Sequence, residues 1–172
     1  MKACQDVAKP GDLIAVQGIG GLGHLALQMA VASGYKVAAI SSSTSKAEMA
    51  KKLGAAYPFT ADKAVEELQK LGGAKAIIGT APNASAVNGI IEGLGHGGKI
   101  VLVGIPQDGA PYSIPSVTLS VMRRSVCGLT CGTAADNEDC LRFADHVGIK
   151  PHVNEFTLDK VSRDSNRCQH RH

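Results

Sequence analysis

Residues 13–23 read LIAVQGIGGLG, and this stretch decides the expected fold of the 172-residue chain. An apolar, β-rich run leads directly into the spacing G-x-G-x-x-G at Gly18, Gly20 and Gly23, and residues 23–33 continue with apolar residues at helical spacing. In such a pattern the first glycine turns the chain out of a strand, the second allows close approach to the backbone, and the third lets helix and strand pack closely. The stretch therefore predicts the first strand and helix of a βαβ unit.

The same alternation continues along the chain. Further strands are expected at 36–40, 57–59, 74–79, 99–103 and 125–129, helices at 46–53, 61–71, 84–94 and 136–146, a turn at 95–98 and a loop at 107–124. With right-handed crossovers, this order predicts an α/β Rossmann fold, a doubly wound six-stranded parallel sheet with strand order 3-2-1-4-5-6. We assign residues 1–161 to one dinucleotide-binding domain and residues 162–172, which are polar and aperiodic, to a disordered or aberrant tail.

A glycine loop between a strand and a helix N-terminus is suited to binding phosphate. Backbone amides at the start of the helix point outwards, and the helix dipole favours negative charge there. The alternative is a purely structural glycine turn, but the preceding strand, the following helix and the βαβ setting favour a dinucleotide site. The residues expected at the pyrophosphate are Gly18, Gly20, Gly21, Leu22 and Gly23.

The serine run at 41–45 bears on the choice of cofactor. Sites for NAD usually carry a carboxylate near the end of the second strand, whereas here no carboxylate follows the glycine loop until Glu48. Small hydroxyls leave room for a 2′-phosphate, which a lysine would neutralise. The serines could also cap the helix expected at 46–53, and both roles can hold at once. We favour NADP over NAD, with the site residues Ser41, Ser42, Ser43 and Lys46.

Charge and hydropathy argue against two classes of partner. The net charge is +3, and the four cations and one anion between residues 160 and 172 account for all of it, so that no basic stripe for nucleic acid is expected on the folded body. No apolar run approaches the roughly 18 residues of a membrane span. The first residues do not resemble a secretion signal, so a cytoplasmic location is expected.

Several short motifs together resemble one family. They are KPGD at 9–12, GIGGLGH at 18–24, TAPN at 80–83, GGK at 97–99, VG at 103–104, RRSV at 123–126 and NEDCLRF at 137–143. Over residues 1–161 the chain resembles the cofactor domain of zinc-dependent medium-chain alcohol dehydrogenases. The serine run with Lys46 is similar to the NADP-preferring branch, which includes the cinnamyl-alcohol-dehydrogenase-like enzymes.

The resemblance implies an oxidoreductase that moves a hydride between NADP(H) and an alcohol or aldehyde. It also implies a nicotinamide end lined by Thr80, Val103, Gly104, Ile105, Leu129 and Thr130. The fold argument agrees, because ligands bind outside the carboxyl ends of the strands at the point where the strand order reverses. Dimers in this family commonly form through the sixth strand, so a homodimer is expected.

The resemblance also indicates what the 172 residues lack. The family holds its catalytic zinc and its substrate largely in a separate β-rich domain, and none of the ligand motifs of that domain occurs here. Cys127 and Cys131 have no second pair that would complete a zinc site. We therefore name no catalytic or metal-binding residue and expect a truncated product that is inactive by itself, with zinc only in the missing domain. The alternative is a non-catalytic nucleotide-binding fragment or a dimerising pseudoenzyme.

Overall fold

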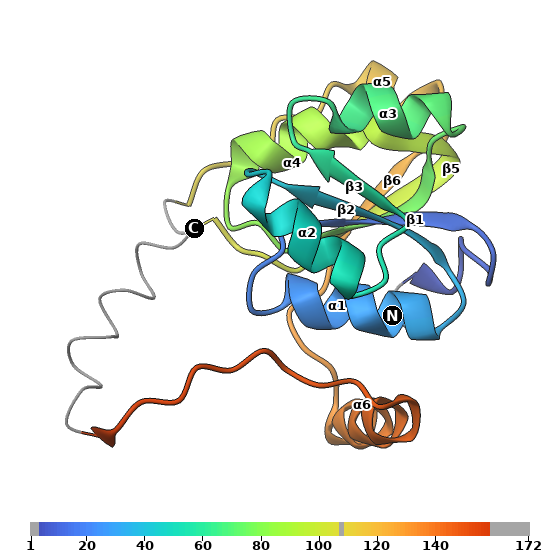
Figure 1. Ribbon diagram of the computed structural model, residues 1–172. Helices are drawn as coiled ribbons and strands as arrows, with labels where there is room; N and C mark the ends of the chain where they lie inside the picture. The colour runs from blue at the N-terminus through green and yellow to red at the C-terminus, as the bar shows by residue number, and fades with distance from the viewer. Residues whose placement is uncertain (1–3, 107–108, 159–172) are drawn as a thin grey trace.

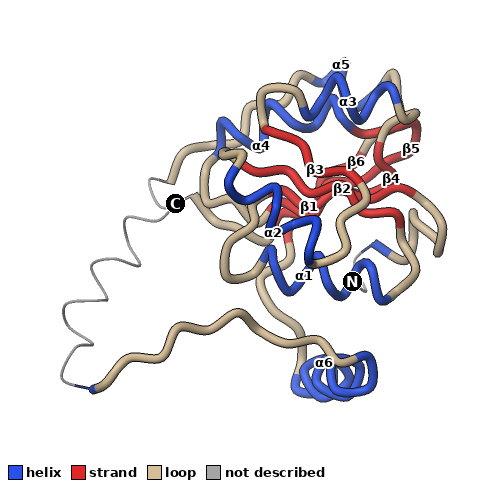
Figure 2. The backbone as a smooth tube through the Cα atoms, in the orientation of Figure 1, coloured by secondary structure: helices blue, strands red, loops and turns tan. Residues whose placement is uncertain are grey.

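A computed structural model describes residues 4–106 and 109–158 of the chain. Its centre is a six-stranded, all-parallel sheet in the order β3-β2-β1-β4-β5-β6. In Figures 1 and 2, α1 and α2 cover one face of the sheet, while α3, α4 and α5 cover the other. The predicted Rossmann fold and strand order are confirmed. The predicted tail at 162–172 lies outside the described residues.

The elements follow the predicted alternation. The strands are β1 (Leu13–Gln17), β2 (Lys36–Ser41), β3 (Tyr57–Thr60), β4 (Ala74–Gly79), β5 (Leu94–Leu102) and β6 (Ser125–Gly128). The helices are α1 (Gly23–Ala32), α2 (Ser45–Lys52), α3 (Ala64–Lys70), α4 (Ala84–Ile90), α5 (Ser116–Ser120) and α6 (Ala134–Val147).

The turn expected at 95–98 and the strand start expected at residue 99 are both wrong. The glycine cluster at 95–98 does not form a turn before the strand, because β5 already begins at Leu94. The close approach of Gly95 to Gly72 and Gly73 keeps the two backbones side by side, and the pairing of β4 with β5 shifts register between Ala74 and Ala76. Glycine therefore permits an irregular continuation of the strand at this point.

Two helical segments also differ from their predictions. The loop expected at 107–124 contains the short helix α5, which follows Pro115. The helix expected at 84–94 is α-helical only to Ile90 and then tightens into a 3₁₀ turn, Ile91–Gly93. The predicted start of that helix is confirmed, because the Asn83 side chain accepts hydrogen bonds from the amides of Ser85 and Ala86.

The core has two layers, one on each face of the sheet. Successive side chains of a strand point to opposite faces, so β1 places Ile14 and Val16 in one layer and Ala15 in the other. Leu27 of α1 completes the first layer, and Leu68 of α3 is buried in the second. Burial on both faces explains why β1 is a continuous apolar run, as is typical of parallel sheets.

Helix α6 lies apart from the sheet in Figures 1 and 2, and none of its residues is buried. Its ends are well formed locally. Thr133 and Asp136 make a reciprocal capping box at the start, and Gly148 closes the helix in the left-handed conformation with φ of 73°. The chain then continues as an extended segment, residues 149–157, which we call the C-terminal strap.

The opposite end of the chain is attached to the sheet by an ion pair. The Lys99 ammonium, on β5, donates to the carboxylate of Asp6. This hydrogen bond lowers the pKa of Asp6 and raises that of Lys99. Nearby, the Cys4 side chain is buried in the first core layer, and burial raises the pKa of its thiol.

We expect Asp6→Asn to lower the melting temperature slightly at pH 7 and not at all in acid. The stabilisation by the Asp6 carboxylate is complete above the ordinary carboxyl pKa of about 4, and is lost as the pH falls through its lowered folded-state pKa. Thermal unfolding of the wild-type and Asp6→Asn chains between pH 2 and pH 7 tests whether their melting temperatures become equal in acid. Glu48→Gln, which breaks an exposed pair with Lys51 within α2, is the control and should have no effect. A difference for Asp6→Asn that does not vary with pH would contradict the electrostatic origin.

Candidate functional site

A cleft of about 530 Å³ lies at the carboxyl ends of the central strands. Its walls come from the glycine loop after β1, the serine run after β2, the segment after β4 and the segment after β5. Strand β1 pairs with β2 on one side and with β4 on the other, so the cleft sits where the strand order reverses. This is the position at which open α/β sheets bind ligands.

The cleft brings together most of the residues that the sequence singled out. Eleven of them line it: Gly18, Gly20, Gly21, Leu22, Ser41, Ser42, Lys46, Thr80, Val103, Gly104 and Ile105. A single dinucleotide site requires these residues to surround one cleft, as they do here. That they contact a ligand stays a prediction.

The other four candidate residues lie just outside the cleft. Gly23 is buried beneath the glycine loop, and the Ser43 hydroxyl lies 3.0 Å from that of Ser45. Leu129 and Thr130, which follow β6, line an adjoining hollow of about 310 Å³ that shares Gly104 and Ile105 with the cleft. The predicted nicotinamide end is thus divided between two neighbouring hollows.

The glycines of the loop are required for two different reasons. Gly18 has φ of 89°, and a Cβ there would lie 2.8 Å from Thr80 Oγ1, while a Cβ on Gly23 would lie 1.7 Å from the Gly18 carbonyl oxygen. At these two positions, neighbouring atoms of the protein leave no room for a side chain. At Gly20 and Gly21 a Cβ would meet no atom within 4 Å, and both residues are exposed. The space in front of them is therefore open to a ligand.

Helix α1 presents its N-terminus to the cleft without a neutralising side chain. Its N-cap residue is Leu22, which makes no side-chain capping bond, and the first turn contains no acidic residue. The outward-pointing amides and the positive end of the helix dipole are thus left for an external anion.

Thr80 has a structural role that the sequence did not indicate. Its hydroxyl lies 2.9 Å from the carbonyl oxygens of both Gln17 and Gly18, and its amide donates to the Gln17 carbonyl at 2.9 Å. The hydroxyl proton is therefore directed into the glycine loop. Thr80 lines the cleft and also supports the glycine loop through these bonds.

Gln17 is a site residue that the sequence analysis missed. It is only 5% exposed, and its Nε2 donates to the carbonyl of Ala86 in α4 at 2.8 Å. Its Oε1 is buried and has no hydrogen-bond partner in the structure. Gln17 therefore lines the cleft while its side-chain amide joins β1 to α4. The signal in the sequence was a glutamine at the end of an otherwise apolar strand.

The serine run does not cap the following helix, so that interpretation is wrong. Thr44 is the N-cap of α2 and makes no side-chain capping bond, while the Ser41 hydroxyl donates to the Ser43 carbonyl at 2.7 Å. The run instead folds on itself beside the cleft. Lys46 is the one charged residue among those that line the cleft, and no carboxylate lines it. The electrostatics of these walls favour an anion.

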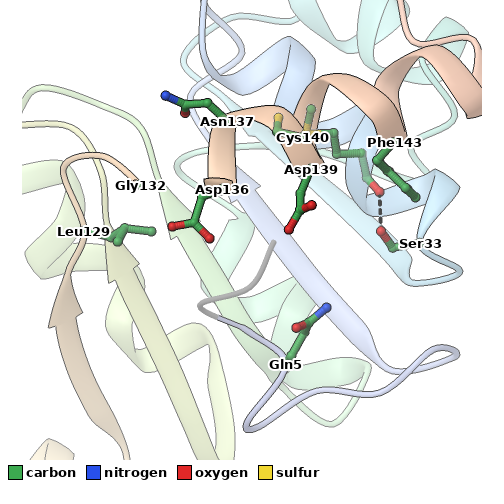
Figure 3. Close-up of a pocket in the computed structure, with 10 residues that line it drawn as sticks. Gln5, Ser33, Leu129, Gly132, Asp136, Asn137, Asp139, Cys140 and Phe143 are labelled. Atoms are coloured by element: carbon green, nitrogen blue, oxygen red, sulfur yellow. Dashed lines mark hydrogen bonds between the residues drawn. The ribbon is translucent and has the colours of Figure 1, made fainter. Parts of the chain in front are cut away.

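A larger hollow, of about 670 Å³, lies elsewhere, between α6, α1 and the N-terminal segment (Figure 3). Asp136 and Asp139 of α6 line it together with Leu129 and Phe143. Its carboxylates disfavour a phosphate, and it contains no glycine-loop amides. The smaller cleft is therefore the candidate site for a dinucleotide.

Among residues 4–106 and 109–158, no three His, Cys, Asp or Glu side chains gather into a group that could hold a metal ion. The described residues thus do not form a zinc site. The same part of the chain contains no helix that is long and apolar enough to cross a membrane.

Comparison with known proteins identifies the family. A sequence profile described as zinc-binding dehydrogenase matches residues 21–146. The chain belongs to this zinc-binding dehydrogenase family. Alcohol dehydrogenase patD of Penicillium expansum is 44% identical over 155 residues, which are 89% of this chain and 45% of that protein. A cinnamyl alcohol dehydrogenase from Sorghum bicolor superposes with a TM-score of 0.87 at 28% identity, covering 97% of this chain and 47% of the other.

A quinone oxidoreductase from Thermus thermophilus, whose structure was solved alone and in complex with NADPH, gives a TM-score of 0.68 at 28% identity. The superposition covers 83% of this zinc-binding dehydrogenase chain and 46% of the quinone oxidoreductase chain. The chain spans less than half the length of each of these three proteins. It corresponds to the nucleotide-binding domain of the zinc-type alcohol dehydrogenases, which confirms the resemblance identified from the sequence motifs.

Two alanine substitutions should separate the structural glycines from the ligand-facing ones. Gly23→Ala forces a Cβ against the Gly18 carbonyl, so we expect it to lower the free energy of unfolding by at least about 2 kcal/mol. Gly20→Ala adds a methyl group in open space and should change stability by no more than about 0.5 kcal/mol. Urea unfolding measures both values. Equal destabilisation by the two substitutions would show that Gly20 is also needed for the fold.

Proposed function

We propose that this chain binds NADP(H) in the cleft at the carboxyl ends of β1, β2, β4 and β5. The observation that carries the proposal is the open backbone at Gly20 and Gly21, in front of the uncapped N-terminus of α1. None of the described residues fills the space where a side chain of Gly20 or Gly21 would stand, and the local field favours an anion. A pyrophosphate fits both requirements.

The preference for NADP over NAD rests on the wall formed after β2. An adenosine ribose bound there would face Ser41 and Ser42 with Lys46 beside them, and no carboxylate lines the cleft to accept bonds from a free 2′-hydroxyl. A lysine ammonium supplies a point charge for a 2′-phosphate. The NADPH complex of the quinone oxidoreductase adds a precedent within the same fold.

For the whole protein we propose hydride transfer between NADP(H) and an alcohol or aldehyde, as the name of the patD relative suggests. Bound NADP(H) supplies or accepts the hydride. This chain binds and orients the cofactor, with Val103, Gly104 and Ile105 beside the nicotinamide and Leu129 and Thr130 in the adjoining hollow. The described residues do not form a site for zinc.

A second candidate is a nucleotide-binding unit without catalysis of its own. The absence of a metal-holding group among the described residues favours it for the chain taken alone. Adding a separately produced substrate domain from a relative distinguishes the two functions. Alcohol oxidation regained with that domain supports the oxidoreductase, whereas binding of NADPH without turnover supports the second candidate.

A fluorescence titration of the purified chain tests the cofactor and its phosphate. We expect saturable binding with at least about tenfold tighter affinity for NADPH than for NADH, because one charge-assisted contact contributes about 1.5–3 kcal/mol. Lys46→Ala should remove most of this preference and leave the affinity for NADH unchanged. Lys52→Ala is the matched control, since Lys52 lies on the same helix and outside the cleft. Equal affinities for the two nucleotides in the wild-type chain would refute the role of Lys46.

We also propose a homodimer that forms through the β6 edge of the sheet. β6 is the last strand in the sheet order and pairs with β5, and an open edge strand favours pairing with another chain. Val117 and Val121, which precede β6, are 63% and 68% exposed and would be covered.

Sedimentation equilibrium tests the dimer. Wild-type chain should sediment as a dimer at micromolar concentration, and Val121→Glu as a monomer, because a buried unpaired charge opposes association. Leu141→Glu is the control, since Leu141 is similarly exposed, at 71%, but lies on α6, away from this edge. A monomeric wild-type chain, or a dimer that Val121→Glu does not disturb, would exclude this interface.

A further inference from the structure

His24, in the first turn of α1, joins the glycine loop to the C-terminal strap. It is 7% exposed, and its two ring nitrogens contact different parts of the backbone. Nδ1 lies 3.0 Å from the carbonyl oxygen of Gly20, while Nε2 accepts a hydrogen bond from the amide of His152 at 3.0 Å. These partners are 4 and 128 residues away in the sequence.

The two partners determine the protonation of the ring. A carbonyl oxygen can only accept, so Nδ1 must carry a proton, and a backbone amide can only donate, so Nε2 must carry a lone pair. The structure therefore selects the neutral Nδ1–H tautomer of His24. A charged imidazolium could not accept the bond from His152.

A second side chain of α1 keeps the strap in place beside His24. Gln28, one helical turn further on, donates from Nε2 to the carbonyl of Lys150 at 3.1 Å and accepts from the Lys150 amide at 3.4 Å. The backbone of residues 150–152 is thus held by two neighbouring side chains on one face of α1. This attachment places the His152 amide where it selects the His24 tautomer.

The bond from His24 to Gly20 affects the part of the loop that faces the cleft. The Gly20 carbonyl accepts both from the His24 amide at 3.1 Å and from the His24 ring, so it is turned toward the helix. In a planar trans peptide the carbonyl and the following amide point in opposite directions. The amide of Gly21 is therefore turned away from the helix, at the exposed position in front of the α1 N-terminus.

We propose that His24 is a positioning residue for phosphate binding. In its neutral Nδ1–H form it holds the Gly20–Gly21 peptide so that the Gly21 amide is preset to donate to a phosphate oxygen, and the strap maintains that form. The inference rests on the proposed dinucleotide function. In addition, the C-terminal strap, which follows α6, controls the conformation of the glycine loop through His24.

Two conservative substitutions separate the two bonds of the ring. The side-chain amide of asparagine reaches the position of Nδ1, and that of glutamine reaches the position of Nε2. We expect His24→Asn to keep the bond to Gly20 and to bind NADPH within about twofold of wild type. His24→Gln keeps the bond to the strap and should bind about fivefold more weakly, the change expected for one hydrogen bond. Circular dichroism and thermal unfolding establish that both variants are folded.

Nitrogen NMR of the ligand-free 172-residue chain tests the positioning independently of cofactor binding. The wild-type His24 ring should show a protonated Nδ1 and an unprotonated Nε2, and the Gly21 amide resonance should shift in His24→Gln but not in His24→Asn. A protonated Nε2, or a Gly21 amide that is indifferent to both substitutions, would overturn the inference.

The binding data distinguish its failure from that of the proposed function. A wild-type chain that binds no NADPH refutes the proposed function, while the NMR result still decides whether His24 orients the loop. A wild-type chain that binds NADPH, with His24→Gln equal to wild type or His24→Asn weakened as much as His24→Gln, refutes the positioning role alone.

Discussion

The close contact between the end of β1 and the start of α1 is the constraint on which the site depends. The Gly18 carbonyl oxygen approaches Gly23 so closely that even a methyl group would overlap it. This contact brings the helix N-terminus to the carboxyl end of the strand and leaves the intervening loop little freedom. Thr80 then supports the loop from β4, so that adjacent strands of the sheet share in holding it.

The chemistry of the cleft follows from what the backbone leaves open. Gly20 and Gly21 have free space in front of them, the first turn of α1 carries no acid, and Lys46 supplies the charge among the lining residues. An anion is thus favoured by amides, a dipole and an ammonium together. The buried Gln17 side chain joins β1 to α4 in the same walls. Recognition of a dinucleotide needs this mixture of positive field and small, directed polar groups.

Helix α6 and the strap extend the structure beyond the packed sheet. α6 buries none of its residues, yet the chain that follows it returns to α1, where the His152 amide donates to His24 and the Gln28 side-chain amide donates to the Lys150 carbonyl. These bonds join side chains of α1 to backbone atoms of the strap. They therefore depend on the backbone conformation of the strap more than on the identity of its side chains. The strap is thereby connected to the Gly20 carbonyl through a single imidazole ring.

Sequence alone determined the order of the elements, the parallel sheet and most of the lining of the cleft. Apolar runs, apolar residues at helical spacing and the glycine spacing are local signals, and in a doubly wound fold the ends of the central strands must meet. Local signals also misled: the serines after β2 do not cap α2, and the glycines at 95–98 continue β5 instead of forming a turn. Only the tertiary structure decided the roles of Gln17, Thr80 and His24. Their hydrogen-bond partners are 69, 63 and 128 residues away in the sequence. A local sequence pattern cannot predict which carbonyl or amide of such a distant segment lies next to a given side chain.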